Sequence, residues 1–217
     1  MGQRVKQGGI ILCGGRSTRM GTSKAELPFG PETMLARIVR LLAEVCDSLV
    51  VVAAEDQTVA QLSKEVIVTR DRRAGRGPLE GLAAGLAALP ETVEAAYVTS
   101  CDVPLLMGGF VQRLFDLLGD HATAVPLSGG FQHPLSAVYR RRLLDVVEAM
   151  LEAERLRPTE LFDIVRTRRV NERELIDVDP RLDTLKNLNR PEDYLAALEQ
   201  AGFAAPTEVL ARFRASE

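Results

Sequence analysis

Two adjacent glycines and three basic side chains lie in one short segment that could bind phosphate. An apolar run at positions 9–13 is followed by Gly14, Gly15, Arg16, Arg19 and Lys24. Glycine lets the backbone approach a ligand because it has no Cβ atom, and successive backbone N–H groups in such a turn bind anions. The pattern predicts a strand followed by a triphosphate-binding loop. The alternative is a solvated turn whose basic side chains are surface charge.

The spacing of these residues excludes two common phosphate-binding loops. A Walker loop has the pattern G-x-x-x-x-G-K-[ST], and no lysine of this segment follows a glycine in that way. The dinucleotide fingerprint G-x-G-x-x-G is also missing, because Gly14 and Gly15 are adjacent. A dinucleotide-dependent redox enzyme is therefore not expected.

The composition is ordinary for a globular chain, with 217 residues, 46% of them apolar and 26% charged. This length fits one large α/β domain, with two small domains as the alternative. The net charge of −3 argues against a nucleic-acid-binding surface, which is usually distinctly basic. Positive charge gathers at the first loop and at positions 70–76, which suits a small anionic ligand.

Three cysteines, Cys13, Cys46 and Cys101, lie in or beside apolar runs and show no metal-binding spacing. A buried free thiol behaves as a small hydrophobic side chain, so a reducing cytoplasm is the simplest location. The N-terminus shows no signal-peptide pattern, and no apolar stretch approaches the roughly 20 residues of a membrane span. We therefore expect a cytoplasmic protein without a membrane partner.

Apolar strands alternate with amphipathic helices after the basic loop. In the first half, strands are expected at 49–53, 66–69 and 95–100, and helices at 33–46, 79–89 and 109–118. In the second half, strands are expected at 122–127, 135–139 and within 168–178, and helices at 141–154, 159–165, 191–201 and after 206. Such alternation implies right-handed crossovers. The sequence predicts an α/β fold, a three-layer α/β/α sandwich around a mainly parallel twisted sheet.

Four positions that matter for chemistry each follow an expected strand: Gly14, Ala53, Asp71 and Asp102. In open parallel sheets, ligands bind outside the carboxyl ends of the strands. The pattern therefore predicts one site at this edge of the sheet.

Asp102 is a candidate ligand for Mg²⁺, because a carboxylate at a strand end would face the phosphate-binding loop. Mg²⁺ takes oxygen ligands and is usually shared between one or two carboxylates and substrate phosphates. The alternative is an aspartate that caps the following loop. Asp71 is the second candidate, and its alternative is a loop carboxylate paired with Arg70 or Arg72.

The first loop resembles the L-x-G-G-x-S-x-R-M-G-x-x-K loop of nucleotidyltransferases, in particular the molybdenum cofactor guanylyltransferase and cytidylyltransferase branch. The C-D-x-P step at Asp102 resembles the metal motif of that superfamily. The segment 76–82 resembles its G-P-L-x-G segment, which lies against the base and ribose. The resemblance implies nucleotide binding by Leu12, Cys13, Gly14, Gly15, Arg19, Lys24, Asp71, Gly77, Pro78 and Gly81. It implies catalysis by Arg19, Lys24 and the metal ligand Asp102. For 76–82 the alternative is a helix start with a packing glycine.

Two later motifs resemble the acceptor side of the molybdenum enzymes. They are the H-P step at His133 and the string N-x-N-x-P-E-D, which supplies Asn187 and Asn189. Asn189 has an alternative role as the N-cap of the next helix, with Glu192 three residues later, which favours Asn187 as the ligand. For His133 the alternative is a structural histidine.

The matched motifs cover nearly the whole chain, so the resemblance implies one Rossmann-like nucleotidyltransferase domain over residues 1–217. Its nucleotide-binding half would span about 8–120 and its acceptor-side half about 121–201. The implied reaction is the Mg²⁺-dependent transfer of GMP from GTP to the terminal phosphate of molybdopterin, with release of pyrophosphate. Proteins that deliver molybdopterin or receive the finished cofactor are the implied partners.

The sequence departs from the family pattern at one position that would contact the base. Guanine-using members often have an asparagine after the second strand, where this chain has Ala53. Glu55 or Asp56 could instead accept hydrogen bonds from guanine, and cytosine stays open. Two further alternatives are a sugar-phosphate nucleotidyltransferase, which shares the loop and the metal aspartate, and a non-catalytic nucleotide-binding module. A pure binder has little need for Arg19, Lys24 and Asp102 together.

Overall fold

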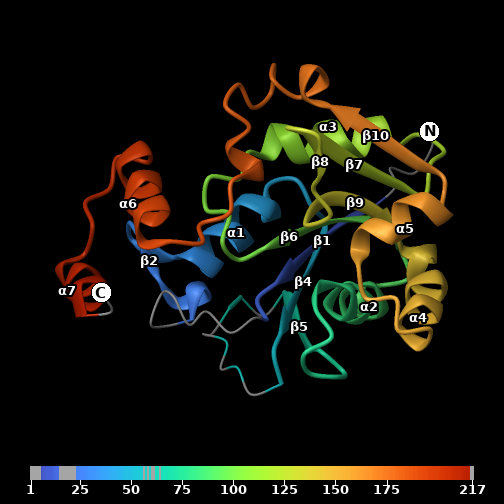
Figure 1. Cartoon of the computed structure of the whole chain (residues 1–217), viewed down its shortest axis with the longest axis horizontal. Helices are drawn as coiled ribbons and strands as arrows, with labels where there is room; N and C mark the ends of the chain where they lie inside the picture. Colours follow the sequence, from blue (N-terminus) through green and yellow to red (C-terminus); the bar gives the residue numbers. More distant parts are fainter. Residues whose placement is uncertain are drawn as a thin grey trace.

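The computed structural model describes residues 6–14, 23–55, 57, 59, 62, 63 and 65–215 (Figure 1). Its main sheet contains β1 (Lys6–Leu12), β4 (Ser48–Ala53), β5 (Val66–Arg70), β6 (Val93–Ser100), β7 (Thr123–Ser128), β8 (Phe131–Gln132), β9 (Ser136–Arg140) and β10 (Thr167–Asn171). The strand order is β10-β7-β9-β6-β1-β4-β5, with β8 paired to β7. Helices cover both faces of this sheet, so the predicted three-layer α/β/α sandwich is confirmed.

Strands β5, β4, β1 and β6 form a continuous parallel block. Leu12, at the end of β1, lies opposite Val52 on one side and Ser100 on the other. The β-branched run of β4 is buried on both faces of the sheet, as is typical of a parallel strand between two helix layers. Because the register is shared, these strands end at one edge, as the sequence predicted.

The other part of the sheet is mixed. β9 is antiparallel to both β6 and β7, whereas β10 is parallel to β7. Gly129 and Gly130 connect β7 to β8 with φ values of 57° and 81°, the left-handed values that a two-residue hairpin turn requires. Of the predicted segment 168–178, only the start is a strand, and the 3-10 helix η4 (Glu172–Glu174) follows it.

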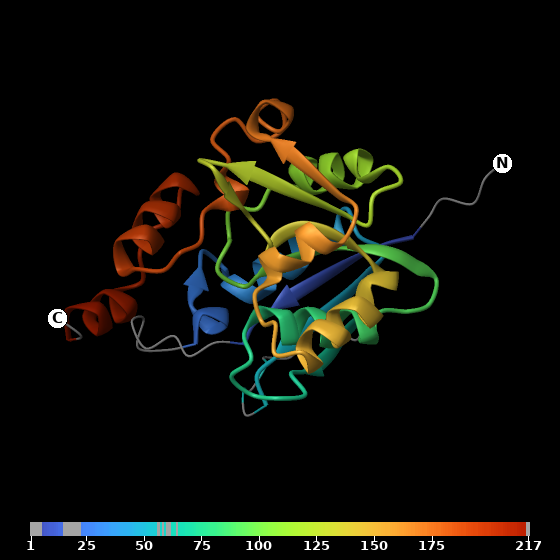
Figure 2. The same cartoon turned by 45° about the vertical axis from the view of Figure 1, so that its right-hand side comes forward.

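A third group of elements packs beside the sheet (Figure 2). It consists of η2 (Lys24–Glu26), the hairpin β2 (Pro28–Phe29) and β3 (Glu32–Thr33), and the helices α6 (Pro191–Gln200) and α7 (Thr207–Ala215). Together they bury Leu27, Phe29, Met34, Leu188, Tyr194, Ala197, Leu198, Val209 and Phe213. The sequence predicted both helices, but not the core that they share with the hairpin.

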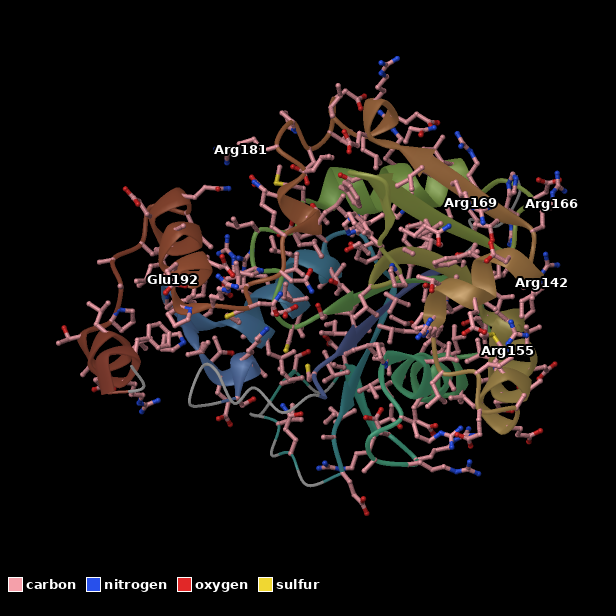
Figure 3. The ribbon with its side chains drawn as sticks, in the orientation of Figure 1. Arg142, Arg155, Arg166, Arg169, Arg181 and Glu192 are labelled. Carbon is pink, nitrogen blue, oxygen red and sulfur yellow. The ribbon has the colours of Figure 1, made fainter. Side chains whose placement is uncertain are left out.

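Exposed arginines lie on the side of the molecule away from α6. Figure 3 labels Arg142, Arg155, Arg166 and Arg169 on that side and Glu192 on α6. Three of these arginines are paired with acidic neighbours: Arg155 with Glu160, Arg166 with Asp120 and Arg169 with Asp163. Exposed pairs of this kind contribute only about 0–1 kcal/mol each, so this face is a solvated, charge-balanced surface. Among the described residues, no helix is long and apolar enough to cross a membrane.

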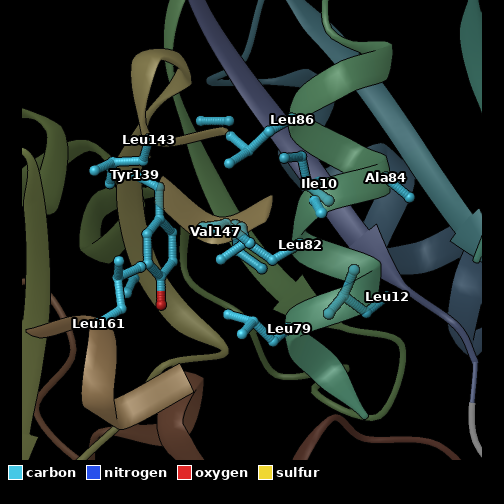
Figure 4. Packing of buried hydrophobic residues seen from close by; sticks show 14 of the residues in the cluster. Ile10, Leu12, Leu79, Leu82, Ala84, Leu86, Tyr139, Leu143, Val147 and Leu161 are labelled. Carbon is cyan, nitrogen blue, oxygen red and sulfur yellow. The ribbon is translucent and has the colours of Figure 1, made fainter. Parts of the chain in front are cut away.

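A hydrophobic core lies between the sheet and each of its two helix layers. One face is covered by α2 (Pro78–Ala88), α4 (Leu144–Glu152) and α5 (Pro158–Ile164), and the other by α1 (Met34–Ala43) and α3 (Gly108–Leu118). β1 alternates between the cores: Ile10 and Leu12 face α2, as Figure 4 shows, whereas Ile11 and Cys13 face the other layer. The helices lie where the periodicity predicted them, except that the 3-10 helix η3 (Arg141–Leu143) precedes α4.

Candidate active site

A pocket of about 350 Å³ opens at the carboxyl ends of β1, β4 and β5. Its lining residues are Leu12, Gly14, Val52, Asp71, Gly75, Gly77, Pro78, Gly81, Ser100 and Leu135. Six of them are predicted nucleotide-binding residues: Leu12, Gly14, Asp71, Gly77, Pro78 and Gly81. The tertiary structure therefore gathers three separate sequence motifs around one hollow of a size that suits a small ligand.

The carboxylate of Asp71 stands between two glycines of the pocket. A Cβ atom on Gly14 would lie 3.1 Å from Oδ2 of Asp71, and one on Gly81 would lie 3.4 Å from Oδ1. Burial, together with the nearby Glu80, raises the pKa of Asp71 above its ordinary value. A side chain at Gly14 would crowd this carboxylate, so that position favours glycine for reasons of space.

Neither neighbouring arginine pairs with Asp71, although the sequence left that alternative open. Arg70 donates to the carbonyl oxygens of Ala54, Glu55 and Gln57. Arg72 instead forms an ion pair with Glu148 at 2.7 Å. Among the described residues, no side chain donates a hydrogen bond to the carboxylate of Asp71.

The start of α2 forms one wall of the pocket. Gly77 has φ 75° and ψ −169°, a conformation that side chains other than glycine rarely adopt, and Pro78 occupies the first helical turn. Gly81 also packs against Leu12, since a Cβ atom there would lie 3.1 Å from Cδ2 of that side chain. The segment 76–82 is therefore a helix start with a packing glycine, and it lines the pocket as well.

Beside the pocket, the ammonium group of Lys24 lies between two acceptors from distant parts of the chain. Its Nζ is 2.7 Å from Oδ2 of Asp102 and 2.8 Å from Oδ1 of Asn189. The hydroxyl of Ser100 donates to the other carboxylate oxygen of Asp102. The side chains of Lys24 and Asp102 are only 16% and 11% exposed, so salt screens this pair less than a surface pair.

Main-chain hydrogen bonds hold the two acceptors in place. The backbone N–H of Leu188 donates to the carbonyl oxygen of Asp102 at 2.9 Å, which joins the two segments directly. The carboxylate of Asp193 accepts from the backbone N–H of Asn189 at 3.2 Å. The Lys24–Asp102–Asn189 cluster therefore rests on fixed backbone rather than on side-chain contacts alone.

The helix-capping alternative for Asn189 is wrong. Helix α6 begins at Pro191 with Arg190 as its N-cap, and Asp193 accepts from the backbone N–H of Arg190 at 3.0 Å. Glu192 has no part in this cap. The side chain of Asn189 is turned toward Lys24 instead, because a carboxylate three residues after the N-cap already serves the helix end.

The other two predicted acceptor-side residues lie outside the cluster. Asn187 is exposed, and its side chain forms no hydrogen bond with any described residue. His133 follows β8, and its Nε2 is buried with no hydrogen-bond partner among the described residues. Burial lowers the pKa of His133, which favours the neutral imidazole.

Sequence reasoning did not foresee a second hollow, of about 560 Å³, at the carboxyl ends of β7 and β10. Its lining residues are Leu127, Gly129, Gly130, Asn171, Glu172, Arg173 and Glu174. Glu172 accepts from the backbone N–H of Gly129 at 2.7 Å, and a hydrogen bond from Ser128 is the main cause that lowers the pKa of Glu172. The adjacent glycines were the available signal, because a tight turn there opens this end of the sheet.

Several predicted residues are placed elsewhere. The thiol of Cys13 is buried in the core beside Cys101, and a hydrogen bond to Cys101, then burial, raise its pKa well above the ordinary value. Ala53 is completely buried, and Glu55 does not line the pocket. Gly15, Arg16, Arg19 and Asp56 lie outside the described residues.

Asp102 fits a Mg²⁺ ion that is shared with substrate. Among the described residues, no group of three or more histidine, cysteine, aspartate or glutamate side chains could hold a metal ion by itself. Mg²⁺ usually needs only one or two carboxylates when phosphate oxygens complete its shell. A single strand-end carboxylate beside a nucleotide-sized pocket suits such a shared ion better than a resident one.

A pocket for a small ligand beside a shielded lysine–aspartate pair, on a sheet of this order, fits a nucleotidyltransferase. Comparison with known families makes this class more specific. Residues 9–166 match the model of the MobA-like NTP transferase domain, and the chain belongs to this family.

The chain is similar to several named proteins along most of its length. It is 33% identical to the molybdenum cofactor guanylyltransferase of Desulfosudis oleivorans over 187 residues, which cover 85% of this chain and 91% of the relative. It is 34% identical to a probable molybdenum cofactor guanylyltransferase of Methanothermobacter thermautotrophicus, covering 84% and 94% of the two chains.

Solved structures share the fold. Molybdopterin-guanine dinucleotide biosynthesis protein A from Archaeoglobus fulgidus superposes with a TM-score of 0.77 at 19% identity, covering 90% of this chain and 98% of that one. The 2-C-methyl-D-erythritol 4-phosphate cytidylyltransferase of Thermus thermophilus superposes with a TM-score of 0.66 at 16% identity, covering 89% and 98%. The same fold therefore serves enzymes that are named for different bases and acceptors.

Proposed function

We propose that this nucleotidyltransferase transfers GMP from GTP to the terminal phosphate of molybdopterin and releases pyrophosphate. The observation that carries the proposal is the Lys24–Asp102–Asn189 cluster at the carboxyl edge of the sheet, beside the nucleotide-sized pocket. The relatives that are named molybdenum cofactor guanylyltransferases support these substrates. In this proposal, residues 8–120 bind the nucleotide and residues 121–201 serve the acceptor.

The base and ribose of GTP occupy the pocket at the ends of β1, β4 and β5. Leu12 and Pro78 offer apolar contact, and the backbone at Gly77 and Gly81 admits a ligand closely. Asp71 offers an ionisable oxygen acceptor to the ribose hydroxyls or to the base edge. These roles agree with the position of each residue in the pocket lining.

No covalent enzyme intermediate is needed, so the residues act by positioning and by charge stabilisation. The acceptor phosphate attacks the α-phosphorus in line, and pyrophosphate leaves. Lys24, with Arg19, neutralises the β- and γ-phosphates, and backbone N–H groups at Gly14 and Gly15 hold the polyphosphate. Asp102 would hold Mg²⁺, which would supply positive charge to offset the negative charge of the phosphates.

The acceptor approaches from the side of β7 and β10. Asn189 receives its terminal phosphate, with Asn187 and His133 further along the acceptor side. β9 separates β6 from β7, so the end of β7, which lines the second hollow, lies about 10 Å from the end of β6, at roughly 4.8 Å per strand. A pterin that carries its phosphate on a short side chain spans a distance of this order.

We place the reaction in the cytoplasm, where the buried thiols of this chain stay reduced. A partner protein that hands over molybdopterin, or receives the product, would protect this unstable compound from water.

Transfer of CMP from CTP is the second candidate. Ala53 supports it, because its side chain has no group that could hydrogen-bond a guanine edge and Glu55 lies outside the pocket lining. Guanine remains the first choice because the relatives quoted above are named guanylyltransferases.

The test incubates the purified protein with Mg²⁺, molybdenum-loaded molybdopterin and each of the four ribonucleoside triphosphates in turn. Pyrophosphate release with GTP alone is expected. Pyrophosphate release with CTP alone would show that the protein is a cytidylyltransferase. Release with none of them, but with a sugar phosphate as acceptor, would overturn the pterin assignment, and nucleotide binding without any release would indicate a binding module.

A further inference from the structure

We infer that Arg37 is a positioning residue, which holds together the three chain segments that carry Lys24, Asp102 and Asn189. Arg37 lies on α1 and touches none of these three side chains. Its guanidinium contacts at least one residue in each of the three segments. The catalytic consequence of this inference rests on the proposed function, whereas the geometric consequence does not.

The first contact is with the segment of Asp102. Nε of Arg37 donates to the carbonyl oxygen of Pro104 at 2.6 Å. Pro104 lies two residues after Asp102, in the turn that follows β6. A charged donor on this carbonyl fixes the turn, and hydrogen bonds to charged groups are stronger than neutral ones.

The second contact is with the hairpin that follows Lys24. The Arg37 guanidinium lies 4.9 Å from the ring centroid of Phe29, and its Nη1 lies 3.4 Å from Oε1 of Glu32. Phe29 and Glu32 are paired across β2 and β3. A cation over an aromatic face, with a carboxylate at its edge, holds this short hairpin against α1.

The third contact is with the chain that follows α6. The Arg37 guanidinium lies 5.8 Å from the ring centroid of Phe203, which also meets Phe29 edge-on. The Phe203 ring covers Gly30, whose φ is +67°, and a Cβ atom there would lie 2.6 Å from the ring. The backbone N–H of Phe203 donates to Leu198 at 2.9 Å, so this ring is fixed to the helix that starts just after Asn189.

Arginine suits this position better than lysine. A guanidinium presents donors along its edge and a flat face to aromatic rings at the same time, whereas an ammonium is a compact point charge. The Arg37 side chain is only 17% exposed, and burial is the main cause that lowers its pKa, although arginine remains charged at neutral pH. The three contacts together hold the guanidinium of Arg37 in this partly buried position.

The same helix provides a matched control. Arg40 also donates to the carboxylate of Glu32, at 2.8 Å and 3.2 Å, but its side chain is 50% exposed. Its other ion-pair partner is Glu44, the C-cap residue of α1. Replacing Arg40 therefore removes a charge and the Glu32 contact without touching Pro104, Phe29 or Phe203.

The first measurement is the acylation rate of Lys24, followed by mass spectrometry with the exposed Lys6 as internal reference. In the wild type, Lys24 is held by two acceptors and should react slowly. In Arg37→Ala the rate should rise about tenfold, the effect of losing one hydrogen bond to a charged group. Arg37→Lys should fall between, and Arg40→Ala should match the wild type. An unchanged Lys24 rate in Arg37→Ala would overturn the inference.

The second measurement is turnover. The expected result for Arg37→Ala is a kcat about tenfold lower, with a smaller change in the KM for GTP, because Arg37 touches no residue that lines the pocket for the base and ribose. Equal changes in Arg40→Ala would show a merely structural role. If Arg37→Ala fails to fold, Arg37→Lys carries the comparison. If the wild-type enzyme shows no turnover, the proposed function fails, while the acylation result still decides the role of Arg37.

Discussion

Lys24 depends on acceptors that its own segment does not supply. The 3-10 helix η2 places its backbone, but Asp102 and Asn189 fix the ammonium group. Removal of one partner from a shielded pair leaves an uncompensated charge, so each member of this cluster is sensitive to substitution.

Asp102→Ala should lower turnover on the order of 10²-fold or more, a typical loss when a preorganised charge-stabilising group is removed. The measurement is pyrophosphate release in the presence of Mg²⁺. Asp116→Ala is the control, because Asp116 is exposed on α3 and bonds to Gln112, away from the pocket. Turnover near the wild-type value in a folded Asp102→Ala variant would end the metal assignment.

His133 predicts a dependence of stability on pH. Burial lowers its pKa in the folded protein below the ordinary value of 6.5. Below about pH 6.5 the unfolded chain therefore binds a proton that the folded chain does not, and the free energy of unfolding decreases as the pH falls. Urea unfolding at about pH 8 and about pH 5.5 should show this loss, and His133→Asn should reduce it. An NMR titration midpoint at or above 6.5 for His133 would contradict the prediction.

Among the elements, the close approach of α2 to β1 places the pocket wall against the first strand. Figure 4 shows α2 packed on Ile10 and Leu12 of β1. A Cβ atom on Gly85 would lie 2.5 Å from Cγ2 of Ile10, so a larger residue there would force Ile10 or the helix to shift. The same helix starts at Gly77 and carries Gly81 into the pocket. Packing in the core and the shape of the site are therefore linked through one helix.

Gly85→Ala should destabilise the protein, although alanine favours helix. The gain in helix propensity is about 1 kcal/mol, whereas overpacking a core costs about 1–3 kcal/mol. We expect a net loss on the order of 1 kcal/mol in urea unfolding. In an Ile10→Ala background the methyl contact is gone, and the same substitution should stabilise by up to about 1 kcal/mol. Stabilisation in the wild-type background would show that Ile10 can move aside.

The elements were largely predictable because their signals are local. The apolar runs at β4 and β6 and the helical periodicity of α1 and α3 identify buried faces without reference to the rest of the chain. The point at which β10 ends, within the predicted segment 168–178, was less predictable. The carboxylate of Glu174 accepts a hydrogen bond from the backbone N–H of Asn171, and the strand ends there. A capping hydrogen bond of this kind involves only a few residues, and it competes with continuation of the strand.

On the scale of the whole molecule, the C-terminal segment completes a site that begins near the N-terminus. Lys24 and Asn189 are 165 positions apart, yet their side chains are hydrogen-bonded. The core shared by the β2–β3 hairpin, α6 and α7 brings them together, and Arg37 joins that core to the turn of Asp102. Nucleotide binding and turnover should therefore depend on different parts of the chain.

Asn189→Ala should lower kcat about tenfold and leave GTP binding nearly unchanged, because it removes one hydrogen bond to the charged Lys24. Stopped-flow turnover and equilibrium binding of GTP measure the two effects. Asn187→Ala is the comparison: as an acceptor-side residue without a contact to Lys24, it should raise KM for the acceptor instead. If Asn187→Ala alone lowered kcat, the sequence-based preference for Asn187 as the ligand would be restored.

The sequence by itself determined the fold class, the family and the residue types of the site, because strand patterns and loop motifs are contained within short segments. Only the tertiary structure decided that Asn189, rather than Asn187, meets Lys24, that Asp71 stands clear of its neighbouring arginines, and that a second hollow lies beyond β9. It also decided the place of Arg37, whose contacts come from three segments. Such contacts arise from packing between distant elements, and spacing along the chain carries no record of which side chains will meet in space.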